Sequence, residues 1–128
     1  MTTTTSLVFG RSRSPRRELV VFESRWLTVS TEIVGVRGDV DATNADAFTD
    51  YVLRDSARRH AMILDMRSVS FMGIEGFSAL HRIAVSCAAA ESHWVVVPSP
   101  AVSRVLSICD PDGLLPCTDT MNAAIESI

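Results

Sequence analysis

The sequence contains no lysine and no apolar run near the length of a membrane helix. All twelve basic residues of the 128-residue chain are arginine, and its apolar stretches are only a few residues long, whereas a bilayer span needs about 18 or more. Near the start, the only apolar stretch is Leu7–Phe9, which is too short for the core of a signal peptide. We therefore expect a cytoplasmic protein that has no membrane partner.

Cysteine is also scarce. Cys87, Cys109 and Cys117 make an odd number in a chain long enough to bury a core, which argues against a disulfide scaffold. The histidines show no zinc-ligand spacing with these cysteines, so we expect no metal. Cys109 and Cys117 lie on either side of a Pro and Gly turn, and the sequence leaves open whether the two form a redox disulfide. We expect all three residues to remain thiols, with Cys117 the most accessible.

The motifs of the common catalytic sites are absent. Neither glycine pattern that binds phosphate, GxGxxG or GxxxxGK[ST], occurs in the chain, and no GxSxG sequence presents a serine nucleophile. Asp65 follows an apolar run and has the chemistry of a general base, but it has no evident partner. We therefore expect a protein that is not an enzyme and needs no cofactor.

The arginines are unevenly distributed. The first 17 residues contain four arginines and no acid, whereas residues 18–128 contain eight arginines against fifteen acidic residues. We expect residues 1–17 to form a disordered basic tail and residues 18–128 to form one domain. Because nucleic-acid binding relies on a basic surface, the acidic domain argues against a nucleic-acid partner.

The pattern of apolar residues changes along the chain. Three short apolar runs come first and predict antiparallel strands at 19–22, 26–29 and 33–36. Helical spacing then begins after Thr43, a candidate N-cap, and continues through Ala57.

The second half of the chain alternates strands with helices. Strands are predicted at 61–64 and 94–97 and a short one at Leu114 and Leu115, with helices around 77–87, 100–109 and 121–128. Because right-handed crossovers place successive strands in parallel, the prediction is an α/β domain with about four helices. Its mixed sheet has antiparallel N-terminal strands and parallel later strands.

Two loops follow strands of the predicted sheet, one at Gly38–Asp41 and one at Ser68–Gly76. Open α/β sheets place their functional sites at the carboxyl ends of strands. These loops are therefore the candidate site.

Three segments in sequence resemble a known family. VRGDVDATNADAF, ILDMRSVSFMGIEGFSAL and WVVVPSPAVSRVLSICDPDGLLP look like the STAS domain of bacterial anti-sigma factor antagonists, and the resemblance runs from about Leu19 to Ile128. It implies a STAS-like fold and a partner, an anti-sigma factor that is usually a serine kinase. Binding that partner frees a sigma factor, so the implied role is transcription regulation.

The resemblance also implies a phosphoacceptor loop, which departs from the family here. The family's loop reads Asp, Ser, Ser, Gly, with the modified Ser before Gly, whereas this chain has Gly73, Ile74, Glu75 and Gly76. Glu75 therefore occupies the acceptor position and cannot be phosphorylated. Its carboxylate has two oxygens and one charge, against about −1.5 to −2 for a phosphate, so it is a partial mimic.

Several consequences of Glu75 stay open at this point. The protein is a constitutive antagonist if the partner tolerates the carboxylate, and otherwise it is locked in the released state or uses another partner. Glu75 is also simply a first-turn acid that suits the helix dipole. Asp39 and Asp41 match the acidic positions of the family's Gly, Glu, Leu, Asp segment, and the second is expected near Glu75.

We predict that one surface binds the partner, and that apolar Ile74 is exposed on it. It comprises Asp39, Asp41, Met72, Gly73, Ile74, Glu75, Gly76 and Phe77. Two other roles stay open: a STAS subunit of another assembly, such as a stress complex or a lipid-transport machine, and a small-ligand sensor. The identity of the partner and the oligomeric state, including a weak homodimer, also stay open.

Overall fold

The computed structural model describes residues 5–11 and 19–128. Five strands form one sheet: β1 (Thr5–Arg11), β2 (Leu19–Trp26), β3 (Thr31–Val40), β4 (Ala61–Met72) and β5 (His93–Pro98). The helices are α1 (Ala45–Leu53), a 3-10 turn (Ser56–Arg58), α2 (Ile74–Ala89), α3 (Pro100–Cys109) and α4 (Met121–Ser127).

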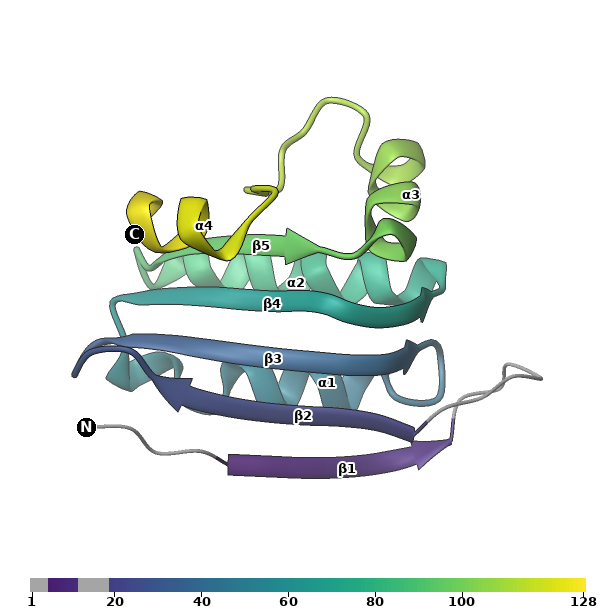
Figure 1. The fold of residues 1–128 in the computed structure, drawn as a ribbon, viewed down its shortest axis with the longest axis horizontal. Helices are drawn as coiled ribbons and strands as arrows, with labels where there is room; N and C mark the ends of the chain where they lie inside the picture. The colour runs from purple at the N-terminus through teal and green to yellow at the C-terminus, as the bar shows by residue number, and fades with distance from the viewer. Residues whose placement is uncertain (1–4, 12–18) are drawn as a thin grey trace.

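The sheet has its strands in the order β1-β2-β3-β4-β5 (Figure 1). β1 pairs with β2 and β2 with β3 in the antiparallel sense, whereas β3, β4 and β5 are parallel. Helices connect the parallel strands because such strands need a long crossover. The predicted α/β class with a mixed sheet is confirmed.

The N-terminal strands differ from the prediction. Trp26 ends β2, and the residues predicted as a strand at 26–29 instead begin the hairpin turn to β3, in which the Leu27 amide donates to the Thr31 carbonyl at 2.8 Å. The prediction was wrong because β2 and β3 extend further than their apolar runs and leave only a short connection.

The predicted disordered tail is corrected over part of its length. Thr5–Arg11 forms β1, in which Leu7 pairs with Phe22 of β2. The free edge of β2 offers backbone groups to a neighbouring strand, and the run Leu7–Phe9 has strong β-propensity. Residues 1–4 and 12–18, the rest of the predicted tail, lie outside the described residues.

Two smaller expectations are also corrected. Asn44, not Thr43, is the N-cap residue of α1, because Thr43 bonds to Asp41 in the preceding loop. Leu114 and Leu115 form no strand; the chain instead meets β5 at an isolated bridge between Val96 and Cys117.

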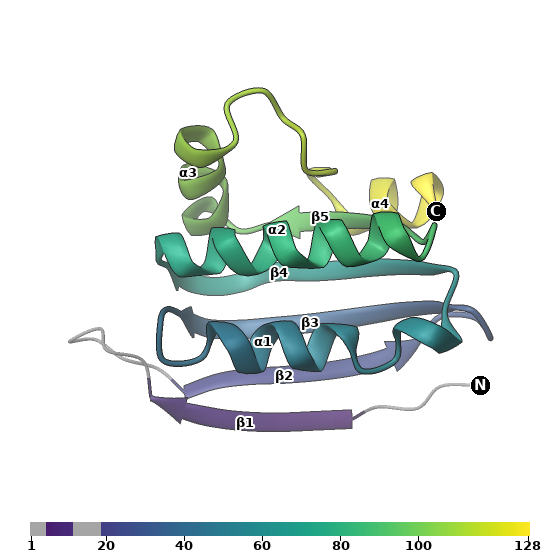
Figure 2. The same cartoon turned by 180° about the vertical axis from the view of Figure 1, so that it is seen from behind.

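Helices α1 and α2 cover one face of the sheet (Figure 2). The core lies between them and the sheet, and α3 adds Val102 and Leu106 to it. Its largest fully buried side chains include Phe22, Phe48, Met62, Leu64, Met66, Leu80 and Ile83. This is the burial that a one-sided amphipathic pattern predicts for helices that pack on a sheet.

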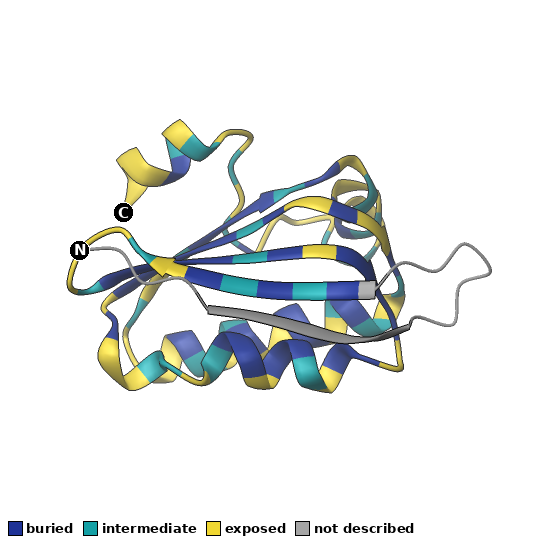
Figure 3. Ribbon diagram, turned by 60° about the horizontal axis from the view of Figure 1, so that its bottom comes forward, coloured by how far each residue is buried: buried dark blue, intermediate teal, exposed yellow. Residues whose placement is uncertain are grey.

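The opposite face of the sheet is covered only in part. A small cluster of Ile33, Ile63, Val95 and Val97 packs there against Ala124 and Met121 of α4. Figure 3 shows the alternation of buried and less buried residues along the strands that results from having two faces. The part of this face over β2, β3 and β4 carries charged residues instead.

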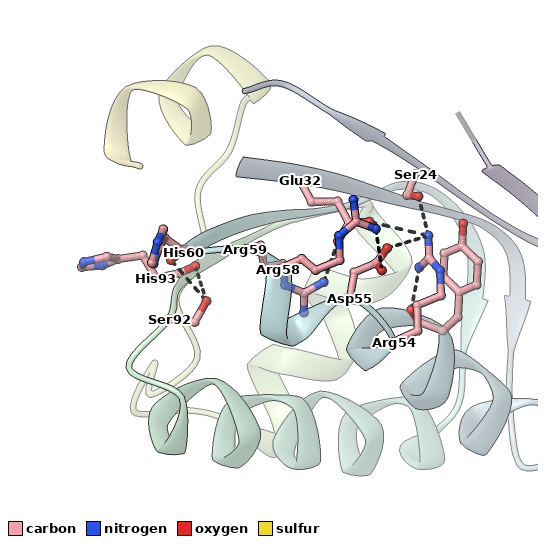
Figure 4. Close-up of polar contacts among 10 residues, drawn as sticks. Ser24, Glu32, Arg54, Asp55, Arg58, Arg59, His60, Ser92 and His93 are labelled. Carbon is pink, nitrogen blue, oxygen red and sulfur yellow. Dashed lines mark hydrogen bonds and ion pairs between the residues drawn. The ribbon is translucent and has the colours of Figure 1, made fainter. Parts of the chain in front are cut away.

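A buried ion pair joins β3 to the segment after α1. Glu32 Oε1 accepts a hydrogen bond from Arg59 Nη1 at 2.7 Å, and their side chains are 0% and 1% exposed. Arg54 Nη2 lies 3.6 Å from the other Glu32 oxygen and donates to Ser24 on β2 (Figure 4). The cluster ties β2 and β3 to the start of β4, at the sheet end opposite the candidate site.

Candidate functional site

The two candidate loops meet at the edge where β3 and β4 end (Figure 1). The Gly73 amide donates to the Val40 carbonyl at 2.9 Å, which joins the start of α2 to the end of β3. Parallel neighbours end at the same edge, so this contact follows from the sheet order. The structure therefore brings the predicted residues 39–41 and 72–77 to one place.

Gly76 is fixed by packing. A Cβ at this position would meet the Met72 side chain at Cγ and at Sδ, the latter at 2.7 Å, and would lie 3.3 Å from a methyl carbon of Val40. Gly76 also donates its amide to the Gly73 carbonyl at 2.9 Å. The first turn of α2 thus lies directly on the ends of β3 and β4.

The Glu75 carboxylate lies over the backbone of Gly73. A Cβ at Gly73 would be only 2.6 Å from Glu75 Oε1, so the carboxylate occupies space that any side chain at position 73 would need. Glu75 is half-buried, and it forms no hydrogen bond or ion pair with other residues of the described chain. Its oxygens can therefore accept hydrogen bonds from water or from a partner.

Apolar side chains surround this carboxylate. Ile74 is 64% exposed and Phe71 is 44% exposed. An edge carbon of the Phe71 ring lies 3.8 Å from the Cβ position of Gly73. Together, Phe71, Ile74 and Glu75 form what we call the α2 entrance. Met72 is buried and Phe77 is half-buried against the core, so these two support the surface from below.

Asp39 and Asp41 are buried, with 2% and 6% of their surface exposed. Asp41 Oδ1 accepts from the Thr43 amide at 2.9 Å, and the Asp41 amide donates to Asn44 Oδ1 at 3.0 Å. Asn44 Nδ2 donates to the Asp39 carbonyl at 2.8 Å. These bonds shape the loop before α1, so both residues are buried there and are not on the exposed surface where they were predicted.

A family model described as "STAS domain" matches residues 28–124. The chain belongs to the STAS domain family. This match covers β3 and everything after it except the last residues of α4, and it includes both candidate loops.

One relative of this STAS domain protein is an osmosensory protein. Osmosensory protein A of Mycobacterium tuberculosis is 30% identical over 100 residues, which cover 75% of this chain and 63% of that protein. The chain thus corresponds to less than two thirds of that relative's length.

The solved structures agree in fold. An anti-sigma factor antagonist from Mycobacterium paratuberculosis superposes with a TM-score of 0.68 at 19% identity, and the match covers 98% of this chain and 94% of that one. The antagonist SpoIIAA in its unphosphorylated form gives a TM-score of 0.66 at 17% identity, over 83% of this chain and 94% of that one. At these identities the likeness shows the fold.

The cysteines of this STAS domain lie apart from the α2 entrance. Cys87 is buried, Cys109 is half-buried and Cys117 is exposed, and all three are free thiols. Burial raises the pKa of Cys87, and the positive charge of nearby Arg59 offsets only part of that rise. Partial burial, and then the negative charge of Asp110, raise the pKa of Cys117. A high pKa keeps a thiol in its unreactive form.

Metal and membrane sites find no support in the described part of the chain. Its residues include no group of three or more His, Cys, Asp or Glu side chains that could hold a metal ion. Among the same residues, no helix combines the length and apolarity needed to cross a bilayer.

Sequence reasoning missed Phe71 as a surface residue. Strand alternation from Leu64 and Met66 places Met72 on the core side and Phe71 on the opposite face, and the two one-residue register shifts between β3 and β4 together keep this alternation at the end of β4. Whether that face is covered there depends on packing by other elements, which the strand pattern does not specify. The aromatic side chain was visible in the sequence, but its exposure was not.

Proposed function

We propose that this STAS domain protein is an anti-sigma factor antagonist, which binds an anti-sigma factor through the α2 entrance and so releases a sigma factor. The observation that carries the proposal is the α2 entrance itself: an exposed isoleucine beside an exposed phenylalanine and a carboxylate, at the phosphoacceptor position of the family. Exposed apolar side chains of this size, gathered in one place, are typical of protein interaction sites.

The chemistry of the α2 entrance indicates what the partner surface must provide. Ile74 and Phe71 need an apolar contact, and Glu75 needs hydrogen-bond donors or a positive charge. A partner surface with apolar side chains and an arginine or lysine meets both needs. A kinase-like anti-sigma factor with that surface is the proposed partner.

The position of the Glu75 carboxylate favours one of the consequences that the sequence left open. A phosphoserine would project its charge at the partner, whereas the carboxylate lies back over Gly73 and leaves Ile74 the outermost side chain of the first turn. We therefore propose that the domain is a constitutive antagonist, always in the form that binds the partner.

The experiment is a titration of the purified chain with the anti-sigma factors of the bacterium that encodes it. One of them should bind, and Ile74→Asp should weaken binding by more than about 1 kcal/mol, the scale that marks an interface contributor. Circular dichroism checks that the variant is folded.

A matched control uses Val29→Asp. Val29 is 91% exposed, and it lies in the turn after β2, at the end of the sheet opposite the α2 entrance. This variant introduces the same change of apolar residue to acid and should bind like the wild-type chain. Equal losses in both variants, or no loss in Ile74→Asp, would place the partner site elsewhere.

The osmosensory relative supports a narrower context. Its name describes a response to osmotic conditions, so we propose that the antagonist acts in an osmotic stress response. Expression of the sigma factor's target genes should rise after an osmotic upshift in cells with this protein and stay flat in cells without it.

A further inference from the structure

The open face of the sheet contains a hollow that the proposed function does not use. Its volume is about 280 Å³, below the roughly 300–1,000 Å³ of clefts that hold drug-sized ligands. The lining residues come from three neighbouring strands: Glu23, Ser24, Arg25, Ile33, Gly35, Asp65 and Arg67. Helices α1 and α2 lie on the other face (Figure 2), so nothing from them reaches it.

Gly35 lines this hollow and lies beside the register shift between Gly35 and Arg37 in the pairing of β3 with β4. It lies in the middle of β3, with Glu23 beside it on β2 and Asp65 beside it on β4. Its backbone has no positive φ, and an added Cβ would meet only Glu23, at ordinary contact distances of 3.5 Å and more.

A glycine inside a strand costs about 0.5–1 kcal/mol relative to alanine. Such a glycine often marks a bulge, and a register shift does follow Gly35; it also marks places where a ligand approaches the backbone closely. The backbone conformation and the packing at position 35 both allow a larger residue. The hollow exists because glycine has no side chain to fill that space.

Charges of both signs surround Gly35. Glu23 on β2 and Asp65 on β4 lie on either side of Gly35 on β3. Neighbouring strands are about 4.8 Å apart, so the backbones of Glu23 and Asp65 are separated by two such spacings. Asp65 Oδ1 and Oδ2 accept from Arg67 at 2.9 and 3.0 Å, which holds its carboxylate in place. A small cation above Gly35 would therefore lie between two carboxylates that already have partners, Asp65 with Arg67 and Glu23 with an interaction of its own, and that still have room for further hydrogen bonds.

Arg25 supplies a positive charge at the rim. It is exposed, lies two residues along β2 from Glu23, and forms no hydrogen bond or ion pair with other described residues. Its guanidinium can therefore bind a carboxylate in the two-point manner typical of arginine. A molecule that carries a positive and a negative group a few ångströms apart matches this arrangement.

We propose that the hollow over Gly35 binds a free α-amino acid. The ammonium group lies over Gly35 between Glu23 and Asp65, the carboxylate pairs with Arg25, and the side chain rests toward Ile33. The site would make this STAS domain a sensor of small zwitterions, separate from the α2 entrance.

The test is a titration of the full-length 15N-labelled chain, followed by NMR. The probes are L-alanine and L-leucine, each compared with its amide, which lacks the carboxylate, and with the carboxylate that lacks the ammonium group, propionate or 4-methylpentanoate. At least one amino acid should shift the amide signals around Glu23, Gly35 and Asp65. It should bind about tenfold more tightly than either matched probe, because only the zwitterion makes both charged contacts.

Two variants separate this site from general charge effects. Gly35→Val fills the hollow with a residue that suits a strand, so the fold should be kept while the amino acid binds about tenfold more weakly. Arg25→Gln should weaken amino-acid binding at least about threefold and leave binding of the amide unchanged. Arg104→Gln, which changes an exposed arginine on α3, is the control and should behave like the wild-type chain.

Three results would overturn the proposal: no shifts with any probe at 20-fold excess over millimolar protein, equal binding of propionate and L-alanine, or unchanged affinity in Gly35→Val. Each of these leaves the proposed function untouched, because the Ile74→Asp experiment uses different residues and a different ligand.

Discussion

The proposed function depends on three residues of the α2 entrance, Phe71, Ile74 and Glu75. Glu75 stands where the family resemblance implies a phosphoacceptor serine, and its carboxylate has space only because Gly73 lacks a side chain. Around it, Phe71 and Ile74 supply exposed apolar surface. We propose that this glutamate replaces a regulated charge with an unregulated one.

The absence of an acceptor leads to a prediction about phosphorylation. Incubation with the partner kinase and labelled ATP should leave the loop unmodified, because the nearest serines, Ser70 and Ser78, are displaced from position 75. Glu75→Ser restores the acceptor and should be labelled under the same conditions, which shows that the kinase is active. Stoichiometric label on Ser68, Ser70 or Ser78 of the wild-type chain would contradict the prediction.

A second prediction at the residue scale concerns the buried ion pair. Glu32→Gln removes the charge that faces the fully buried Arg59 guanidinium, whose Nε and Nη2 already have no hydrogen-bond partner in the described structure. Breaking such a pair costs about 3–5 kcal/mol because a buried charge is left uncompensated. Urea denaturation should show a loss of that order in the free energy of unfolding.

The surface pair of Arg82 and Asp46 provides the comparison. Its atoms lie 3.0 Å apart, but the two side chains are 48% and 88% exposed, and pairs of this kind contribute only about 0–1 kcal/mol. Asp46→Asn should therefore change stability little. A similar small effect for Glu32→Gln would show that Arg59 finds other partners.

At the scale of the elements, the close packing of α2 on the strand ends positions the site. Gly76 allows the first turn to approach Met72 and Val40, and Gly73 bonds to Val40. α3 is anchored in a similar way at the end of β5, where Ser99 caps it by accepting from the Val102 amide at 3.2 Å. Both helices therefore start directly from the functional edge of the sheet.

Gly76→Ala should destabilise the protein by up to about 2 kcal/mol. Alanine improves helix propensity by about 1 kcal/mol, but overpacking against Met72 costs about 1–3 kcal/mol. Thermal and urea unfolding measure the difference, with Ser78→Ala, an exposed change in the same helix, as the control. A variant more stable than the wild-type chain would show that the Met72 side chain moves aside freely.

On the scale of the whole molecule, the two faces of the sheet have different roles. One is sealed by α1 and α2 over the main core, and the other is sealed only where α4 packs. The sealed side contains Cys87, whereas the open side contains the charged hollow over Gly35. Burial on one side and exposure on the other thus separate the main core from the hollow that we propose to bind a ligand.

Burial of Cys87 leads to a prediction about alkaline pH. Its pKa in the folded protein is raised above the ordinary value of about 9, mainly by desolvation. The folded state therefore keeps a proton on Cys87 that the unfolded chain loses as pH rises. The contribution of this proton to the free energy of unfolding is fully present below about pH 9 and is lost as pH rises through the folded pKa. Urea unfolding at pH 8 and pH 10 should show a decline that is smaller in Cys87→Ala, and equal declines would contradict the assignment.

Several features could be predicted because they depend on local patterns. The helix from Pro100 to Cys109 was predicted at its observed bounds because its apolar spacing and the proline at its start are local signals. The parallel strands followed from short apolar runs that alternate with helices. The meeting of the two candidate loops was predicted because neighbouring parallel strands end on the same side of a sheet.

The sequence by itself determined the class of the fold and the family motifs, including a glutamate where those motifs imply a serine, since each depends on residue identities or short spacings. Only the tertiary structure decided which side chains are exposed: it left Phe71 uncovered, buried Asp39 and Asp41, and placed Glu75 over Gly73. It also added β1 to the free edge of β2. These outcomes depend on strand register and on contacts between residues far apart in the chain, which local patterns do not specify.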